Sequence, residues 1–158
     1  MRRGATSVLK WFSALYVVLI VIQVYLAGEG IFGLNVIKHS DDCDKKGANL
    51  VAEHCVGNSK TLDAHRALGF FLTLPGALLF LIVALIAWVP NTRIRVISIV
   101  VPILTFVQMI LPAGGRWVGA LHPVNAILIL IMYGWLFHAL RKEGRADETA
   151  PAATAPGG

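Results

Sequence analysis

Four long apolar runs constrain the fold of this chain more than any other feature of its sequence. They cover approximately residues 11–33, 64–89, 96–113 and 117–140 of a chain of 158 residues. A helix needs about 20 predominantly apolar residues to cross the hydrocarbon core of a bilayer. Charged residues make up only 15% of the chain, whereas soluble domains carry about 25%. The sequence therefore predicts an all-α, polytopic membrane protein with four transmembrane helices.

The segments outside the runs are more polar. We expect residues 1–10 to form a short basic N-terminus, residues 34–63 an outer loop, and residues 141–158 a disordered tail that ends in Ala, Pro, Thr and Gly. The first run is longer than the roughly 7–15-residue apolar region of a signal peptide, so we expect an uncleaved helix. Ala27-Gly28 nevertheless offers a small-residue cleavage site.

The connections between the runs predict the topology. Residues 90–95 and 114–116 are short turns, which make consecutive helices antiparallel, so an up-down four-helix bundle is the natural closure. Pro75 predicts a kink in the second helix. We find no internal repeat. The glycines at the end of the first run could support close packing in a homodimer: they are Gly28, Gly30 and Gly33.

Basic residues beside the spans predict the orientation, because Lys and Arg concentrate on the cytoplasmic side. With four spans, most of these residues share one side: Arg2, Arg3, Lys10, Arg93, Arg95, Arg141, Lys142 and Arg145. We therefore expect a multi-pass protein of the plasma membrane with both termini in the cytoplasm. The net charge of +5 comes largely from these topology signals, so the lipid bilayer and not nucleic acid is the expected partner.

Two histidines lie near the outer ends of the second and fourth runs. His65 is followed four residues later by Gly69, and His122 by Ala126. Residues i and i+4 share a face of a helix, so each histidine has a bare patch beside it where a flat ligand could lie. The second and fourth helices of an up-down bundle are parallel and diagonal. The pair therefore predicts axial ligation of one haem b iron across the bundle core.

Two arginines on the outer side support a haem site. Arg66 and Arg116 lie against the positive-inside trend, and the anionic propionates of a haem would explain them. A straight-helix count is less favourable. His65 precedes Val89 by 24 residues and His122 precedes Leu140 by 18, a difference of about 9 Å in depth. Helix tilt, a kink at Pro75 or a fourth helix that extends into the cytoplasm would absorb it.

The remaining histidines and both cysteines have less specific interpretations. His138 has no histidine partner at its depth, so we expect it at the membrane interface. Cys43 and Cys55 are the only cysteines; an oxidising exterior favours a disulfide between them, worth about 3 kcal/mol in the chain-entropy model. They could instead form a redox-active pair, or bind zinc or copper together with His39 and His54.

Taken together, His65-Arg66, His122-x-x-x-Ala126 and the outer cysteine pair resemble one half of haem A synthase. This resemblance implies a four-helix unit with paired histidine haem ligands. That family has a glutamate three residues before the first histidine, where this chain has Leu62. The chain is also similar to a family of small four-helix membrane proteins of unknown function, with the same His-Arg-Ala-Leu-Gly and Leu-His-Pro-x-Asn-Ala pieces.

The sequence leaves two main classes of function open. The first is a b-type haem protein that transfers electrons, with a quinone or another redox membrane protein as partner, or that handles haem. The second is a non-enzymatic assembly or accessory protein without cofactor, whose histidines hydrogen-bond to polar groups of the core: Gln23, Glu29, Gln108 or Asn125. A transporter is disfavoured because four helices are few for alternating access. No nucleophile with a base, phosphate loop or nucleotide site is evident.

Overall fold

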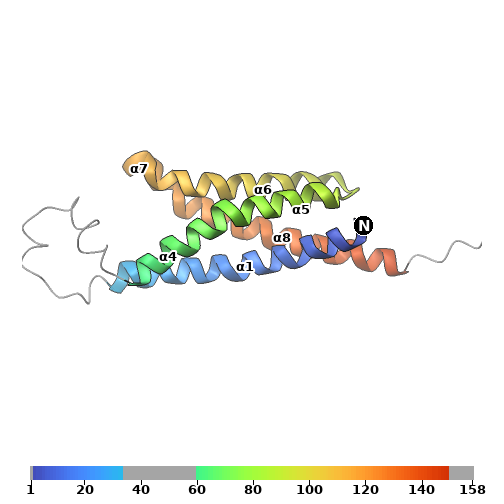
Figure 1. Cartoon of the computed structure of the whole chain (residues 1–158), viewed down its shortest axis with the longest axis horizontal. Helices are drawn as coiled ribbons and strands as arrows, with labels where there is room; N and C mark the ends of the chain where they lie inside the picture. The colour runs from blue at the N-terminus through green and yellow to red at the C-terminus, as the bar shows by residue number, and fades with distance from the viewer. Residues whose placement is uncertain (1, 34–59, 150–158) are drawn as a thin grey trace, which may run out of the picture.

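The computed structural model describes residues 2–33 and 60–149, and nearly all of them are helical. Helix α1 is followed by a second rod of three pieces, a third rod of three pieces and a single fourth helix (Figure 1). Their bounds are α1 Arg2–Gly33, α4 Lys60–Phe71, the π-helical turn η2 Leu72–Gly76, α5 Ala77–Ala87, α6 Thr92–Ile110, the 3-10 turn η3 Leu111–Gly114, α7 Gly115–Gly119 and α8 Leu121–Thr149.

Four stretches of these rods are long and apolar enough to cross a membrane. They are Gly4–Gly28, Asp63–Ala87, Thr92–Gly114 and Trp117–Arg145. Most of their large apolar side chains are exposed on the surface of the bundle, as is expected where lipid and not water is the surrounding solvent. The predicted all-α fold with four membrane-spanning helices is thereby confirmed.

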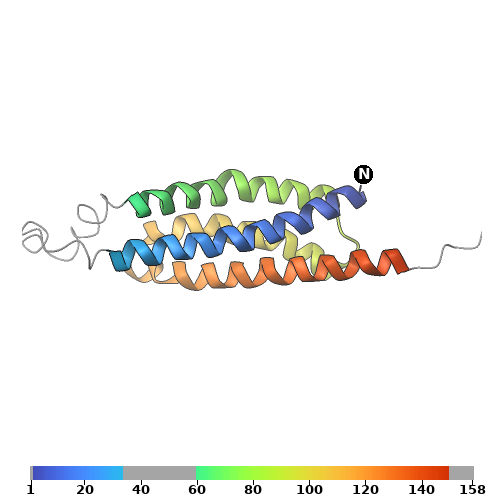
Figure 2. The same ribbon diagram turned by 90° about the horizontal axis from the view of Figure 1, so that it is seen from below.

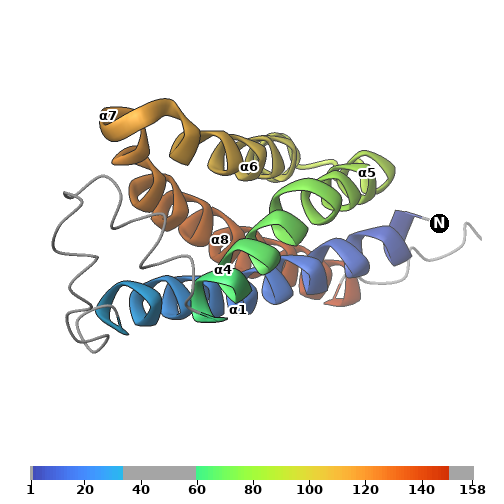
Figure 3. The ribbon, with the colours of Figure 1, turned by 60° about the vertical axis from the view of Figure 1, so that its left-hand side comes forward.

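The rods are arranged as an up-down bundle (Figure 2). α1 packs against α4, α5 and α8, and α6 packs against α5 and α8. The second and fourth rods are therefore diagonal neighbours, as predicted. The start of α1, the end of α8 and the α5–α6 turn lie at one end of the bundle (Figure 1), and α4 and α8 begin at the other. Near that second end, α4 stays beside α1 while α6 and α7 stay with the start of α8 (Figure 3).

Aromatic rings hold the middle of the bundle together. Tyr16 of α1 stacks on Tyr133 of α8, with ring centroids 4.4 Å apart and planes 21° apart. Phe80 of α5 meets both rings edge-on, at 5.6 and 5.0 Å. All three side chains are buried, and such geometries add about 0.5–1.5 kcal/mol per pair beyond the area they bury. This cluster therefore joins three of the four rods.

The irregularity expected at Pro75 takes the form of a π-helical turn. Proline has no N–H to donate, and Ala77 N–H donates to Leu72 O across a wider turn. The Tyr16 hydroxyl donates to the same Leu72 O at 3.0 Å. A Cβ on Gly76 would lie 2.6 Å from Tyr16 Oη, so only glycine lets the tyrosine approach.

Several helix boundaries differ from the sequence prediction. The second rod begins at Lys60 and the third at Thr92, not near residues 64 and 96. The first helix already begins at Arg2 and not near residue 11. The last continues to Thr149, so the tail predicted to be disordered from residue 141 is helical over its first nine residues. Residues 141–149 consist mostly of charged residues and alanine, many of them good helix formers, and Glu143 accepts a 2.8 Å hydrogen bond from Asn91 Nδ2. The outer-loop cysteines, Cys43 and Cys55, lie outside the described residues.

A candidate cofactor pocket between two histidines

A pocket of about 530 Å³ lies between the four rods, toward the end where α4 and α8 begin. This volume is in the range of small-molecule and cofactor sites, about 300–1,000 Å³. Residues from all four rods line it. Five of the six residues predicted to bind a cofactor are among them: His65, Arg66, Gly69, His122 and Ala126. The sixth, Arg116, belongs to α7, and its side chain lies outside what the structure describes.

Each histidine is held by a glutamine of the preceding rod. Gln23 Nε2 donates to His65 O at 2.7 Å, and His65 Nδ1 lies 3.1 Å from Gln23 O. Gln108 Nε2 donates to His122 O at 2.9 Å, and His122 Nδ1 lies 3.1 Å from Gln108 O. The two glutamine–histidine pairs thus use the same four atoms in the same way. One joins α1 to α4, and the other joins α6 to α8.

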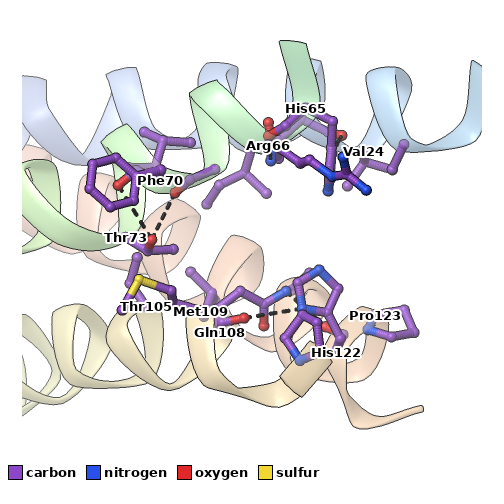
Figure 4. A pocket seen from close by; sticks show the side chains of 18 of the residues that line it. Val24, His65, Arg66, Phe70, Thr73, Thr105, Gln108, Met109, His122 and Pro123 are labelled. Carbon is purple, nitrogen blue, oxygen red and sulfur yellow. Dashed lines mark hydrogen bonds between the residues drawn. The ribbon is translucent and has the colours of Figure 1, made fainter. Parts of the chain in front are cut away.

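These hydrogen bonds determine the tautomer of both rings. A backbone carbonyl can only accept, so each Nδ1 must carry the proton that it shares with the glutamine carbonyl. The Nε2 atom of each neutral imidazole then keeps its lone pair. Figure 4 shows His65 with Arg66 on one wall of the pocket and His122 with Gln108 on the opposite wall. An Nδ1–H bonded to a backbone carbonyl is also the usual support of a metal-ligating histidine.

The two pairs divide the bundle into related halves, a relation that we did not find in the sequence. Gln-Val-Tyr-Leu begins at Gln23 and Gln-Met-Ile-Leu begins at Gln108. Each is followed by a histidine with a small residue four positions later. The repeat is not evident in the sequence because the glutamine–histidine spacing differs between the halves: Gln23 and His65 are 42 residues apart, whereas Gln108 and His122 are 14 apart.

The halves differ in how the second glutamine oxygen is satisfied. Gln108 Oε1 accepts a 2.7 Å hydrogen bond from Asn125 Nδ2, which also donates to Leu104 O at 3.1 Å. Gln23 Oε1 is buried and has no partner among the described residues. The position equivalent to Asn125, three residues after His65, is Leu68. The α6–α8 pair is therefore the better bonded of the two.

Gly69 has a role beyond the one predicted for it. It lines the pocket, as expected, but a Cβ at this position would also lie 2.7 Å from Gln23 Nε2. The missing side chain at Gly69 therefore leaves room for the Gln23 amide as well as for a ligand in the pocket.

The 9 Å depth difference expected from straight helices does not separate the histidines, since both line the same pocket. The fourth helix runs past Leu140 to Thr149, whereas the second rod ends at Ala87. The second rod also carries the π-helical turn at Pro75, so an irregularity at Pro75 and an extended fourth helix, two of the three features named in the sequence analysis, are both present.

Two other predicted groups, Arg66 and His138, are exposed. The Arg66 Nη1 atom is 3.8 Å from Asp63 Oδ1, so this weak surface ion pair leaves the guanidinium accessible at the rim. Within residues 2–33 and 60–149, no three His, Cys, Asp or Glu side chains are grouped to hold a metal ion. A haem iron needs only two such ligands, because the porphyrin supplies the other four.

Comparison with protein-family models, with curated protein sequences and with solved structures found no match for this chain.

Proposed function

We propose that the pocket binds one b-type haem, with His65 and His122 as axial ligands, for electron transfer or haem handling. The observation that carries the proposal is the matching set of hydrogen bonds around the two histidine rings. Both Nδ1 atoms are engaged by backbone carbonyls, and both rings line one pocket. Two neutral imidazoles with available Nε2 atoms on diagonal helices are the donor set of bis-histidine haem proteins.

The remaining residues of the pocket also fit a haem. The lining is predominantly apolar, as a porphyrin face requires. The small residues Gly69 and Ala126 leave space for the ring beside each histidine. Arg66 lies at the rim of the pocket, where it would pair with a propionate. The resemblance to one half of haem A synthase implies the same arrangement.

A haem bound here would supply one-electron oxidation and reduction. The chain's contribution is to hold the ligands. The Gln23 and Gln108 carbonyls keep each Nδ1 protonated, which leaves each Nε2 free to bind a metal. The glutamine amides fix the backbone of each histidine against the neighbouring rod, so the two rings are prepositioned on facing walls. Two histidine ligands would suit the site to electron transfer and not to oxygen binding.

The alternative is an assembly or accessory protein without a cofactor, and one observation favours it. The histidines hydrogen-bond to Gln23 and Gln108, as that hypothesis expected. Hydrogen bonds between helices in membrane proteins contribute about 0.6 kcal/mol on average and up to about 1.7. The two pairs could therefore serve only to lock the helices together.

The visible spectrum of the purified protein, oxidised and reduced, separates the two functions. We expect a low-spin Soret spectrum in the wild type, as purified or after addition of haemin. His65→Ala and His122→Ala should each remove it, and the exposed His138→Ala is the matched control that should retain it. A wild type that stays colourless after haemin addition would refute the proposal, and so would spectra that neither pocket substitution changes.

We also propose that the basic end of the bundle faces the cytoplasm of a plasma-membrane protein. Arg93 and Arg95, at the start of α6, share that end with both described ends of the chain, which is the pattern of the positive-inside rule. Labelling of intact cells tests this orientation, with a single cysteine at Lys142 or at Asp63, one at each end, in a chain that carries Cys43→Ser and Cys55→Ser. Labelling of the Asp63 position alone by an impermeant reagent is the expected result.

A further inference from the structure

The pocket reaches the surface of the bundle between α4 and α6. α4 packs on α1 and scarcely touches α6, which packs instead on α5, η2 and α8. Phe70 of α4 and Met109 of α6 both line the pocket, and they are 58% and 42% exposed. Pro112 of η3 is also exposed and lines the pocket. We call Phe70, Met109 and Pro112 the mouth. Figure 4 shows Phe70 and Met109 on the two opposite walls.

Two of the three mouth residues, Phe70 and Met109, lie well inside the candidate membrane spans. Phe70 is seven residues inside the span Asp63–Ala87, and Met109 is five residues inside the end of Thr92–Gly114. At 1.5 Å per residue these positions are about 8–10 Å below the span boundary. A water-soluble electron carrier does not reach this depth, and a phospholipid phosphate stays at the interface above it.

The chemistry of the mouth suits a neutral planar head group on an apolar chain. The exposed Phe70 ring offers a face for stacking, and Met109 is a flexible, polarizable contact. Arg66, one turn toward the boundary from Phe70, is exposed and has five N–H donors, so it can bind a carbonyl oxygen as well as the propionate proposed above. The outward side of both helices is apolar and exposed, which leaves a path for a lipid-like tail.

We propose that the mouth docks a membrane quinone or its quinol, with the head group against Phe70 and Met109, a ring oxygen at Arg66 and the isoprenoid tail in the bilayer. The inference rests on the proposed haem function for its purpose, because a quinone would be the lipid-soluble electron partner of a haem behind the mouth. The binding itself does not require haem.

Equilibrium binding of decylubiquinone to the detergent-solubilised full chain tests the proposal. Phe70→Ala/Met109→Ala removes two exposed contacts and should weaken the affinity about tenfold, the loss expected for two apolar side chains. Arg66→Gln should weaken it as well. The control, Leu78→Ala/Ile103→Ala, alters equally exposed side chains of the same two rods away from the mouth and should bind as the wild type does.

The outcomes separate this proposal from the haem proposal. Equal affinities in all variants, or displacement of decylubiquinone by an equal concentration of phosphatidylglycerol, would overturn the quinone site even if the protein carries haem. Selective loss of binding in the mouth variants of a protein that never shows a Soret band would support the quinone site and refute the haem. The visible spectrum of each sample should be recorded as well, so that haem content and quinone affinity are measured on the same preparation.

Discussion

The two glutamine–histidine pairs predict unequal consequences for equivalent substitutions. Methionine has nearly the length of glutamine without its polar atoms, so Gln23→Met and Gln108→Met remove the same amide from each half. Gln108 makes two side-chain hydrogen bonds, one to His122 O and one from Asn125. Gln23 makes one, to His65 O, and buries an oxygen without a partner.

The magnitudes follow from these bonds. At about 0.6–1.7 kcal/mol for each hydrogen bond between helices, Gln108→Met should lower the free energy of unfolding by about 1–3 kcal/mol. Gln23→Met loses one such bond, but it also removes a buried unsatisfied acceptor, whose desolvation costs about 1–3 kcal/mol. Its net effect should be close to zero. We therefore expect Gln108→Met to be the less stable variant by about 1–3 kcal/mol.

Unfolding in mixed micelles by titration with dodecyl sulfate, followed by circular dichroism, measures the difference. Asn125→Leu copies the residue at the equivalent position of the other half. In the Asn125→Leu background, Gln108→Met should lower the free energy of unfolding by less, because the bond between Asn125 and Gln108 is already absent. The double-mutant cycle measures this coupling energy. Equal stabilities of the two glutamine variants, or a lower stability of Gln23→Met, would refute the reasoning from the hydrogen bonds.

Two further predictions concern the turns of the bundle. Gly76→Ala should destabilise by about 1–3 kcal/mol, as overpacking does, because its Cβ would meet the buried Tyr16 hydroxyl at 2.6 Å. Gly134→Ala, whose Cβ meets nothing within 4 Å, should leave the free energy of unfolding unchanged in the dodecyl sulfate titration. Equal losses of stability in the two variants would contradict a role for the Gly76–Tyr16 contact. Asn91→Ala should cost about 1 kcal/mol, because Asn91 Oδ1 caps α6 and its Nδ2 bonds Glu143; a wild-type unfolding midpoint would argue against the cap.

Much of the candidate site was predictable because it depends on local spacing. The i,i+4 relation of His65 to Gly69 and of His122 to Ala126 is a property of any helix, and antiparallel order follows from short turns. Both histidines do line one pocket. The glutamines were named only as general polar partners of the histidines. Their reciprocal bonds to backbone atoms, which determine the tautomer, were not predictable from composition or spacing.

The aromatic cluster and the mouth were also missed. Tyr16, Phe80 and Tyr133 are apolar-run residues like many others, and nothing in their spacing selects them for the centre of the bundle. Phe70 and Met109 come to border one opening because α4 stays with α1 and leaves α6. The π-helical turn at Pro75 lies between α4, which leaves α6, and α5, which packs on it.

The sequence by itself determined the number of spans, their order and the end of the bundle at which the histidines lie. These depend on apolar length, turn length and residue position, which are all local. Only the tertiary structure decided which glutamine meets which histidine and where the pocket opens. A membrane helix is apolar on nearly every side, so it carries little periodic signal of which face points inward. The rotation and register that bring Gln23 to His65 and Gln108 to His122 arise only when the helices pack.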